Sequence, residues 1–237
     1  MSNPLLEISG LNAYYGKSHV LQGIDLRVHS GELVVVVGRN GMGKTTLMRA
    51  VLGLPPARRM GKIVFDGRET VEKPTHEIAA MGVGYVPQGR LLFSSLTVDE
   101  HLQFACRKKR KESQWTPDTV YELFPELRNR VRVGGSRLSG GEQQMLAIGR
   151  ALVTNPTLLM MDEPSEGLAG IVIQRVEQAC RHLISRGMAI LLVEQNLEMA
   201  QALADRAYIF YNGRIAYEAP GQVFREEREK VGGYLGI

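Results

Sequence analysis

The stretch LVVVVGRNGMGKTT, residues 33–46, contains the pattern that decides the fold. Its five leading apolar residues include four valines and predict a buried parallel strand over 33–37. The next residues satisfy G-x(4)-G-K-[ST], a phosphate-binding loop that joins a strand to a helix, here expected from Lys44 to about Gly53. Backbone N–H groups in such a loop, together with the positive end of the helix, can bind phosphate oxygens. A chance glycine loop is the alternative, and the strand–loop–helix context argues against it.

Each residue of this loop has an expected role. The ammonium group of Lys44 should reach the β- and γ-phosphates of a nucleotide, and the hydroxyl of Thr45 should bind Mg²⁺. The loop residues expected to contact the nucleotide are Gly38, Arg39, Asn40, Gly41, Met42, Gly43, Lys44, Thr45 and Thr46.

A second apolar stretch, LLMMDE at 158–163, ends in two adjacent carboxylates. Because side chains alternate along a strand, Asp162 and Glu163 should have different roles. Asp162 is expected to hold Mg²⁺ directly or through water, and Glu163 to accept a proton from an attacking water molecule. Acidic residues often end strands without any catalytic role, so it is the pairing with the phosphate-binding loop that favours this interpretation.

The stretch RLSGGEQQ, residues 137–144, predicts a second anion-binding helix end. Ser139 and Glu142 form a capping-box pattern in front of a helix with one apolar face. An ordinary capped helix is the simpler interpretation. It does not account for Gly140 and Gly141, each of which costs up to about 1 kcal/mol in a helix. We infer that something approaches the backbone closely here and that this helix end can bind a phosphate.

The composition limits the classes of protein to consider. With 237 residues, 44% hydrophobic and 23% charged, the chain can bury the core of one globular domain, and its net charge of +4 does not require a nucleic-acid partner. We expect no signal peptide and no membrane span, since the apolar runs fall short of the roughly 20 residues needed. Cys106 and Cys180 lack a CxxC partner and are expected to be packing residues in a reducing cytosol.

Strand-like patterns lie on both sides of a helical segment. Residues 89–151 carry helical patterns, including a capped helix from Thr97 to about Lys109, and the tail after residue 220 is expected to form a terminal helix and a packing tail. The sequence therefore predicts an α/β core with a helical insert. Besides 33–37, strands are expected at 4–9, 24–28, 62–65, 83–86, 158–161, 189–193, 208–211 and 214–217.

The sequence LSGGE, between the phosphate-binding loop and the acidic strand end, resembles the signature motif of ATP-binding cassette (ABC) ATPases. The resemblance extends over essentially the whole chain. It implies an α/β fold with a P-loop NTPase (RecA-like) core, an antiparallel β subdomain and an inserted α-helical signature subdomain. Residues 1–237 would form a single ABC ATPase domain, with 1–88 and 152–237 in the core and β subdomain and 89–151 in the helical subdomain.

The resemblance also implies a set of site residues and ligands. Tyr15 looks like the aromatic residue that stacks on adenine, and Gln88 like the glutamine that senses Mg²⁺ and the lytic water. Ser139, Gly140 and Gly141 would hold the γ-phosphate of an ATP molecule bound to a second cassette, packed head to tail. The implied ligands are ATP and Mg²⁺. The metal would lie near Thr45, Gln88 and Asp162, and the catalytic set would be Lys44, Gln88, Glu163 and Gln195.

Two positions depart from the usual pattern of this family. Gln195 stands where a switch histidine is usual, and glutamine can hydrogen-bond toward a γ-phosphate but cannot carry a proton at neutral pH. In the D-loop, residues 165–169, Ala169 replaces the aspartate that usually reaches across the dimer interface. Whether the two composite ATP sites turn over equally is therefore an open question.

Longer segments are similar to the cassettes of branched-chain amino acid importers, of which urea or amide importers are close relatives. This resemblance implies an identical or different second cassette, membrane permeases, and indirectly a periplasmic or extracellular solute-binding protein, without nucleic acid. The location implied is the cytoplasmic face of the bacterial inner (plasma) membrane. The segments include YYGKSHVLQGIDL (14–26), PTHEIAAMGVGYVPQGRLLF (74–93) and MDEPSEGLAG (161–170).

Two other functions remain as alternatives. A soluble cassette ATPase acting on nucleic acid generally carries long coiled-coil inserts or two fused cassettes, and this chain has neither. A small-molecule kinase would leave RLSGGEQQ unexplained. The basic run RKKRK at 107–111 is expected to be the end of a surface helix, with anionic lipid or a permease loop as the alternative contact.

Overall fold

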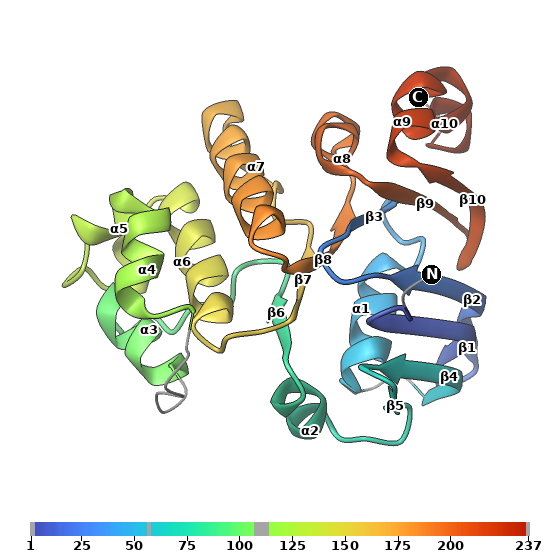
Figure 1. The fold of residues 1–237 in the computed structure, drawn as a ribbon, viewed down its shortest axis with the longest axis horizontal. Coiled ribbons are helices and arrows are strands. Elements are labelled where there is room, and N and C mark those ends of the chain that lie inside the picture. The colour runs from blue at the N-terminus through green and yellow to red at the C-terminus, as the bar shows by residue number, and fades with distance from the viewer. Residues whose placement is uncertain (1–2, 56–57, 107–113, 236–237) are drawn as a thin grey trace.

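The computed structural model describes residues 3–55, 58–106 and 114–235, and its strands form two sheets (Figure 1). The first sheet is antiparallel, with the strand order β2-β1-β4-β5. Its strands are β1 Leu6–Tyr15, β2 Ser18–Val28, β4 Arg58–Phe65 and β5 Arg68–Glu69.

The second sheet has six strands in the order β10-β9-β3-β8-β7-β6 and is parallel apart from the edge strand β10. Its strands are β3 Leu33–Val37, β6 Val83–Val86, β7 Leu158–Asp162, β8 Ala189–Glu194, β9 Arg206–Tyr211 and β10 Arg214–Pro220. Strands β3 and β7 end at the same edge, since β3 and β7 both pair in parallel with β8. This arrangement places the phosphate-binding loop beside Asp162 and Glu163.

Helices cover the six-stranded sheet and extend away from it (Figure 1). Helix α1 contacts β1 and β2 of the antiparallel sheet as well as β7, so it packs between the two sheets. Helices α3, α4, α5 and α6 form a group beyond α7, on the side of the molecule away from the antiparallel sheet. The helices are α1 Lys44–Leu52, α2 Thr75–Ala80, α3 Val98–Ala105, α4 Pro117–Leu123, α5 Pro125–Arg128, α6 Gly140–Leu152, α7 Gly170–Ser185, α8 Leu197–Leu203, α9 Gly221–Glu226 and α10 Arg228–Leu235.

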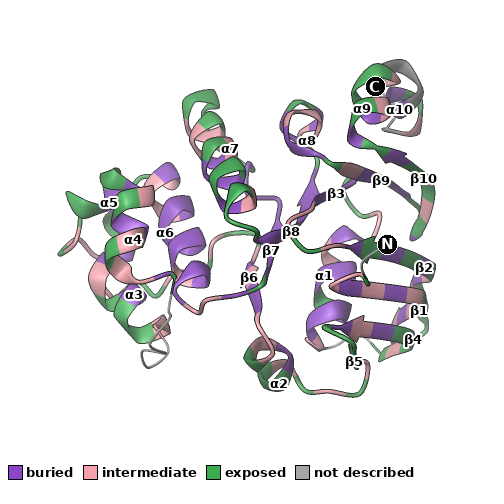
Figure 2. Cartoon of the chain, in the orientation of Figure 1, coloured by how far each residue is buried: buried purple, intermediate pink, exposed green. Residues whose placement is uncertain are grey.

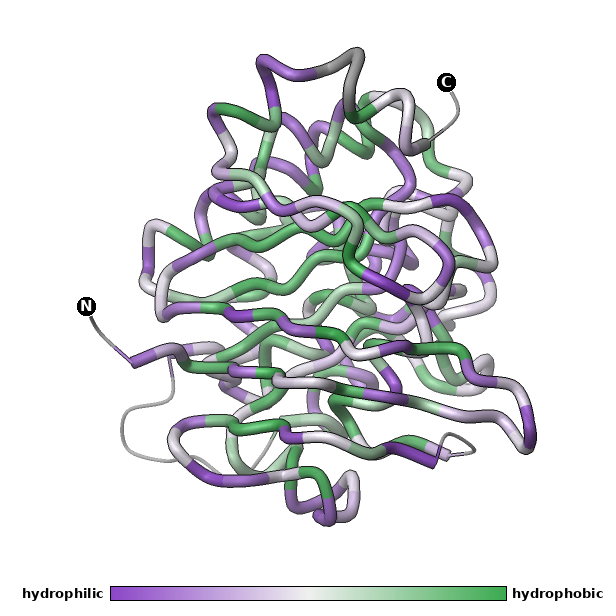
Figure 3. The backbone as a smooth tube through the Cα atoms, turned by 90° about the vertical axis from the view of Figure 1, so that its right-hand side faces the viewer, coloured by the Kyte–Doolittle hydropathy of each residue, from purple (hydrophilic) through white to green (hydrophobic). Residues whose placement is uncertain are grey.

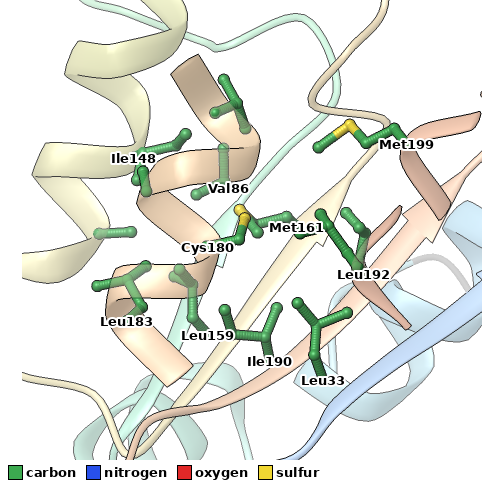
Figure 4. Close-up of a cluster of buried hydrophobic side chains, with 14 of the residues drawn as sticks. Leu33, Val86, Ile148, Leu159, Met161, Cys180, Leu183, Ile190, Leu192 and Met199 are labelled. Atoms are coloured by element: carbon green, nitrogen blue, oxygen red, sulfur yellow. The ribbon is translucent and has the colours of Figure 1, made fainter. Parts of the chain in front are cut away.

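The core lies on both faces of the six-stranded sheet, because alternate residues of its strands point to opposite sides. Val34 and Val36 pack toward α1 and the antiparallel sheet, whereas Val35 and Val37 join the cluster that includes α6, α7 and α8. Figure 2 shows the buried positions concentrated on the inner strands and on α6, and Figure 3 shows hydrophobic residues along the same strands. In Figure 4, Cys180 of α7 lies among these side chains, and it is 1% exposed, as expected for a packing cysteine.

The structure confirms the α/β architecture and every strand that the sequence predicts, with corrected ends. Strands β1 and β2 run to the hairpin turn at 16–17 instead of ending at 9 and starting at 24, because bulges break the alternation without breaking the ladder. Helix α3 ends at Ala105 and not near Lys109, since Cys106 adopts extended backbone. The tail forms two short helices, α9 and α10, instead of one.

The described part of 89–151 contains helices and one isolated bridge, Thr97 with Gly134, but no strand. The basic run at 107–111 lies outside the described residues. Within 3–55, 58–106 and 114–235, none of the helices is long and apolar enough to cross a bilayer.

Candidate nucleotide-binding site

The loop after β3 leaves the N-terminus of α1 uncovered. Its N-cap, Gly43, has a φ of 105°, a conformation that favours glycine, and no side chain accepts a hydrogen bond from the first turn of the helix. The free N–H groups and the positive end of the helix can therefore bind an anion. A cavity of about 310 Å³ opens at this point, lined by Val20, Asn40, Gly41, Gly43, Lys44, Thr45, Thr46, Gln88 and Glu163.

Lys44 is the buried cation of this cavity, and its side chain is 3% exposed. Its Nζ lies 2.9 Å from Oε1 of Glu163, whose side chain is 7% exposed. The same ammonium donates hydrogen bonds to the carbonyl oxygens of Gly38, at 2.7 Å, and Arg39, at 3.1 Å. Lys44 is thus satisfied within the chain, with Glu163 as its anionic partner.

Asp162 lies at the end of β7 between two hydroxyl groups. Thr45 Oγ1 donates to its Oδ1 at 3.3 Å, and the hydroxyl of Tyr85 donates to its Oδ2 at 3.4 Å. Burial raises the pKa of the Asp162 carboxyl, while the two hydrogen bonds act against this shift. A hydroxyl and a carboxylate side by side are suitable oxygen ligands for Mg²⁺.

Glu163 adopts a left-handed backbone, with a φ of 48°, which is costly for a residue other than glycine by roughly 1–2 kcal/mol. Its N–H donates to the carbonyl oxygen of Val193 at 2.9 Å. Gln88 Nε2 lies 3.4 Å from Oε2 of Glu163 and donates to Glu166 at 3.0 Å. Asp162 and Glu163 therefore have different neighbours, but strand alternation is not the cause, because β7 ends at Asp162 and the left-handed backbone of Glu163 turns its side chain to other partners.

The signature segment forms the capping box that the sequence predicts. Ser139 Oγ accepts from the Glu142 N–H at 3.3 Å, and Oε2 of Glu142 accepts from the Ser139 N–H at 2.8 Å. The glycine at 141 has a reason inside the chain: a Cβ there would lie 2.9 Å from both methyl groups of Val172 on α7. Close packing of α6 on α7 therefore requires Gly141, whatever also approaches its backbone.

Ser139 and Gly141 do not line the cavity at the phosphate-binding loop. They line a separate cavity of about 380 Å³ between α6 and α7, together with Glu142, Met145 and residues of α7. The two helix ends that the sequence predicts to bind anions thus open into different cavities.

Other residues expected at the site lie near it without lining the cavity. Tyr15 is half-buried at the end of β1, opposite Ser18, while Val20 on β2 contributes to the cavity wall. Met42 faces the β9–β10 turn, where its carbonyl oxygen accepts from the Gly213 N–H at 3.0 Å. Gln195 is exposed. Arg39 is exposed and Gly38 buried, and neither is part of the cavity wall.

Sequence reasoning missed three residues that contact the site loops. Tyr85 lies on β6, which pairs with β7, and its contact with Asp162 depends on that pairing, which no local pattern indicates. Arg90 donates to the carbonyl oxygen of Glu166 at 3.3 Å and lies 3.5 Å from Oε1 of Gln143, which no sequence pattern indicates. Glu194, a charged residue at the end of the apolar strand β8, is 1% exposed.

A phosphate-binding loop with an acidic strand end beside it, together with a second capped glycine helix end, is the arrangement of a P-loop ATPase. Residues 21–166 match the family described as ABC transporter. The chain belongs to this family, as an ABC transporter ATP-binding subunit.

Similar proteins cover nearly the whole chain. The high-affinity branched-chain amino acid transport ATP-binding protein BraG of Pseudomonas aeruginosa is 42% identical, over 98% of this chain and 100% of the relative. The probable branched-chain amino acid transport ATP-binding protein LivF of Archaeoglobus fulgidus is 35% identical, over 95% and 96%. A solved ATP-binding cassette of an ABC transporter in an ADP conformation has a TM-score of 0.81 at 25% identity, covering 100% of both chains.

Proposed function

We propose that this chain hydrolyses ATP at a site whose reacting groups come from two cassettes. In its own half, Lys44 binds the β- and γ-phosphates after releasing Glu163, and the N–H groups of residues 38–46 bind the remaining phosphate oxygens. Glu163 then takes a proton from the attacking water, and Gln88, whose Nε2 lies 3.4 Å from Oε2 of Glu163, orients that water. The 2.9 Å contact between Lys44 and Glu163 supports this order, because the two groups lie side by side in one cavity.

Mg²⁺ fits the pair formed by Thr45 and Asp162, with Gln88 as a further oxygen ligand. The described residues contain no cluster of three or more His, Cys, Asp or Glu, so this pair would hold the ion together with phosphate and water oxygens. Bound there, the ion would neutralise phosphate charge. Asp162 itself is oriented by the hydroxyls of Thr45 and Tyr85.

The observation that carries the proposal is the separation of the two anion-binding ends. Ser139 and Gly141 open into a cavity that shares no lining residue with the cavity of Lys44. Each chain therefore offers one phosphate-binding loop and one unpaired signature segment. A head-to-tail pair, in which Ser139, Gly140 and Gly141 of one chain meet the γ-phosphate on the other, completes both sites. Tyr15 is proposed to stack on the adenine, and Gln195 to contact the γ-phosphate side.

We further propose that the transporter imports branched-chain amino acids. The relatives BraG and LivF, both named for branched-chain amino acid transport, cover at least 95% of the chain and support this substrate. The partners are a second cassette, two permeases and, through them, a solute-binding protein, and the chain lies at the cytoplasmic face of the bacterial inner membrane. Residues 89–151 act as the helical subdomain and 1–88 with 152–237 as the core. Urea or short-chain amides are the alternative solutes.

The two-chain site is tested by comparing Ser139→Ala with Lys44→Ala. Lys44→Ala should weaken ATP binding to the isolated chain and abolish turnover. Ser139→Ala should leave ATP binding to the isolated chain within about twofold and lower kcat by about 100-fold or more. Equal loss of binding and turnover in Ser139→Ala would contradict the proposal, because Ser139 would then act on its own chain's nucleotide.

The solute is tested by uptake in the source cells. Replacing the native gene by Glu163→Gln should abolish uptake of labelled leucine, isoleucine and valine and leave urea uptake unchanged. Loss of urea uptake alone would support the alternative. If uptake of neither the branched-chain amino acids nor urea is lost, the chain takes part in neither transport process.

A further inference from the structure

A buried carboxylate at the end of β8 connects two loops of the site. Glu194 is 1% exposed and follows Val193, whose carbonyl oxygen accepts from the Glu163 N–H. It directly precedes Gln195, the residue at the switch position. The residue before Glu194 thus bonds to the backbone of the proposed catalytic base, and the residue after it is the switch residue itself.

Four donors from two loops converge on this carboxylate. Oε1 accepts from the Ser165 N–H at 3.0 Å, and Oε2 accepts from the Ser165 hydroxyl at 2.9 Å. Oε2 also accepts from the N–H groups of Gln195, at 3.0 Å, and Asn196, at 3.1 Å. Ser165 is itself 7% exposed and begins the D-loop. One side chain therefore links the D-loop to the backbone of the switch position.

The chemistry of these contacts requires a carboxylate. All four donors are neutral, and within the described residues Glu194 has no salt bridge, so its charge is compensated by hydrogen bonds alone. A glutamine at this position has one acceptor oxygen and would direct an NH₂ group at N–H donors. At least one buried N–H would then lose its partner, which costs about 1–3 kcal/mol. A structure that needed only packing here would have no reason to keep the charge.

The loop that Glu194 holds includes a strained residue. Glu163 keeps a φ of 48°, two residues before Ser165, and such a conformation persists only where the surroundings over-determine it. The fixed points around Glu163 are its N–H bond to Val193 and the double contact of Ser165 with Glu194. On the switch side, the Asn196 carboxamide caps α8 by accepting from Met199 N–H at 3.0 Å, so Gln195 is held on both sides.

We propose that Glu194 is a positioning residue for ATP hydrolysis, which fixes the D-loop and the switch position relative to each other through Ser165, Gln195 and Asn196. This role rests on the proposed function, since it assumes that Glu163 is the base and that Gln195 faces the γ-phosphate. The side chain of Glu194 accepts hydrogen bonds from Ser165, Gln195 and Asn196 and none from the phosphate-binding loop, so its effect belongs to the catalytic step and not to ATP binding.

The test uses the full-length chain with its partner cassette. Glu194→Gln should lower kcat by about tenfold to 100-fold, with the ATP dissociation constant within about threefold of the wild type. Ser165→Ala should also lower kcat, and Glu194→Gln should add less to Ser165→Ala than to the wild type. Glu198→Gln, the same chemical change on an exposed residue of α8, is the matched control and should leave kcat unchanged.

Two results overturn the role of Glu194. One is a kcat of Glu194→Gln within twofold of the wild type, and the other is additivity of the Glu194→Gln and Ser165→Ala effects. If Glu194→Gln fails to fold, the comparison of Ser165→Ala with Ser165→Thr tests the role of Glu194 instead. Threonine keeps the hydroxyl donor that alanine lacks, so the kcat of Ser165→Thr should be close to that of the wild type. If the wild-type chain hydrolyses no ATP with its partner cassette, the proposed function itself is contradicted. This result is distinguishable from the two results that overturn the role of Glu194.

Discussion

Replacement of Glu163 by glutamine tests two roles of this carboxylate separately. One is its competition with ATP for Lys44, and the other is its proposed role as the base in hydrolysis. In the wild type, ATP has to displace Glu163 from the ammonium group, to which it is bound at 2.9 Å. In Glu163→Gln the amide is a weaker partner, so less free energy is lost when the phosphate arrives. The substitution should therefore tighten ATP binding while it removes the proposed base and stops hydrolysis.

The magnitudes follow from the burial of the pair. Removing one partner of a buried ion pair costs about 3–5 kcal/mol when the other charge is left alone. Lys44 retains the carbonyl oxygens of Gly38 and Arg39, and glutamine offers one amide oxygen, so we expect about 2 kcal/mol of lost stability without nucleotide. If about 1.4 kcal/mol of that energy opposes ATP binding in the wild type, Glu163→Gln binds ATP about tenfold more tightly.

Calorimetric titration of ATP with EDTA present measures the affinities without turnover, and urea unfolding measures the stability. Glu166→Gln is the matched control, because Glu166 contacts Gln88 but not Lys44, and its ATP affinity should stay within about twofold of the wild type. The reasoning is refuted if Glu163→Gln loses ATP affinity to the extent that Lys44→Ala does. In that case Glu163 would assist binding and not compete with the nucleotide.

Three further substitutions test packing and protonation. Gly213→Ala should destabilise the chain by about 3 kcal/mol or more in urea unfolding, because its Cβ would lie 2.0 Å from the carbonyl oxygen of Val20. Gly67→Ala is the control, since a Cβ at this turn meets open space, and it should cost only about 1 kcal/mol. Gly141→Ala should cost about 1–3 kcal/mol by the same assay, and Val172→Ala should restore most of it; additive losses would contradict the contact. Burial lowers the pKa of His101 in the folded chain. Below about pH 6.5 the unfolded chain therefore binds more protons than the folded chain, and the free energy of unfolding decreases as the pH is lowered. His101→Gln should reduce the slope of the free energy of unfolding against pH by up to about 1.4 kcal/mol per pH unit.

Local patterns were sufficient to predict the site elements. The run 33–37 and the loop after it specify a strand and a helix by composition alone, and the capping box at Ser139 needs only residues three apart. These predictions succeeded because each depends on neighbours within one element. The expectation that the adjacent carboxylates at 162 and 163 have different surroundings rested on strand alternation, whereas β7 ends at Asp162 and the left-handed backbone of Glu163 separates the two side chains.

Contacts between elements could not be predicted in the same way. The packing of Gly141 on Val172 joins α6 and α7, which are neighbours in space but are separated in the chain by β7. The sequence indicated a close approach at this glycine but not what approaches. The pairing of Lys44 with Glu163 likewise depends on the order of β3, β8 and β7 in the sheet. Bulges in β1 hid its full length, because a bulge shifts the alternation on which strand prediction depends.

The segment after Gln88 explains how the helical group can affect the site. Gly89, Arg90 and Leu91 have φ values of 75°, 66° and 44°, three consecutive residues in the left-handed region, two of them not glycine. Arg150 of α6 holds this segment by donating to the carbonyl oxygens of Arg90, at 3.1 Å, and Leu91, at 2.8 Å. Such a conformation relaxes when its external contacts are lost.

Arg90 continues this connection to the D-loop, where it donates to the Glu166 carbonyl oxygen, and Glu166 in turn accepts from Gln88. We therefore expect a displacement of α6 to move Gln88 as well, because Arg150 of α6 holds Arg90 and Leu91, and Gln88 directly precedes this strained segment. The position of the signature helix and the orientation of the glutamine beside Glu163 are thus coupled within a single chain. If Ser139 binds the nucleotide of a second cassette as proposed, we expect this binding to change the hydrogen bonds of Gln88 in the first chain's own cavity.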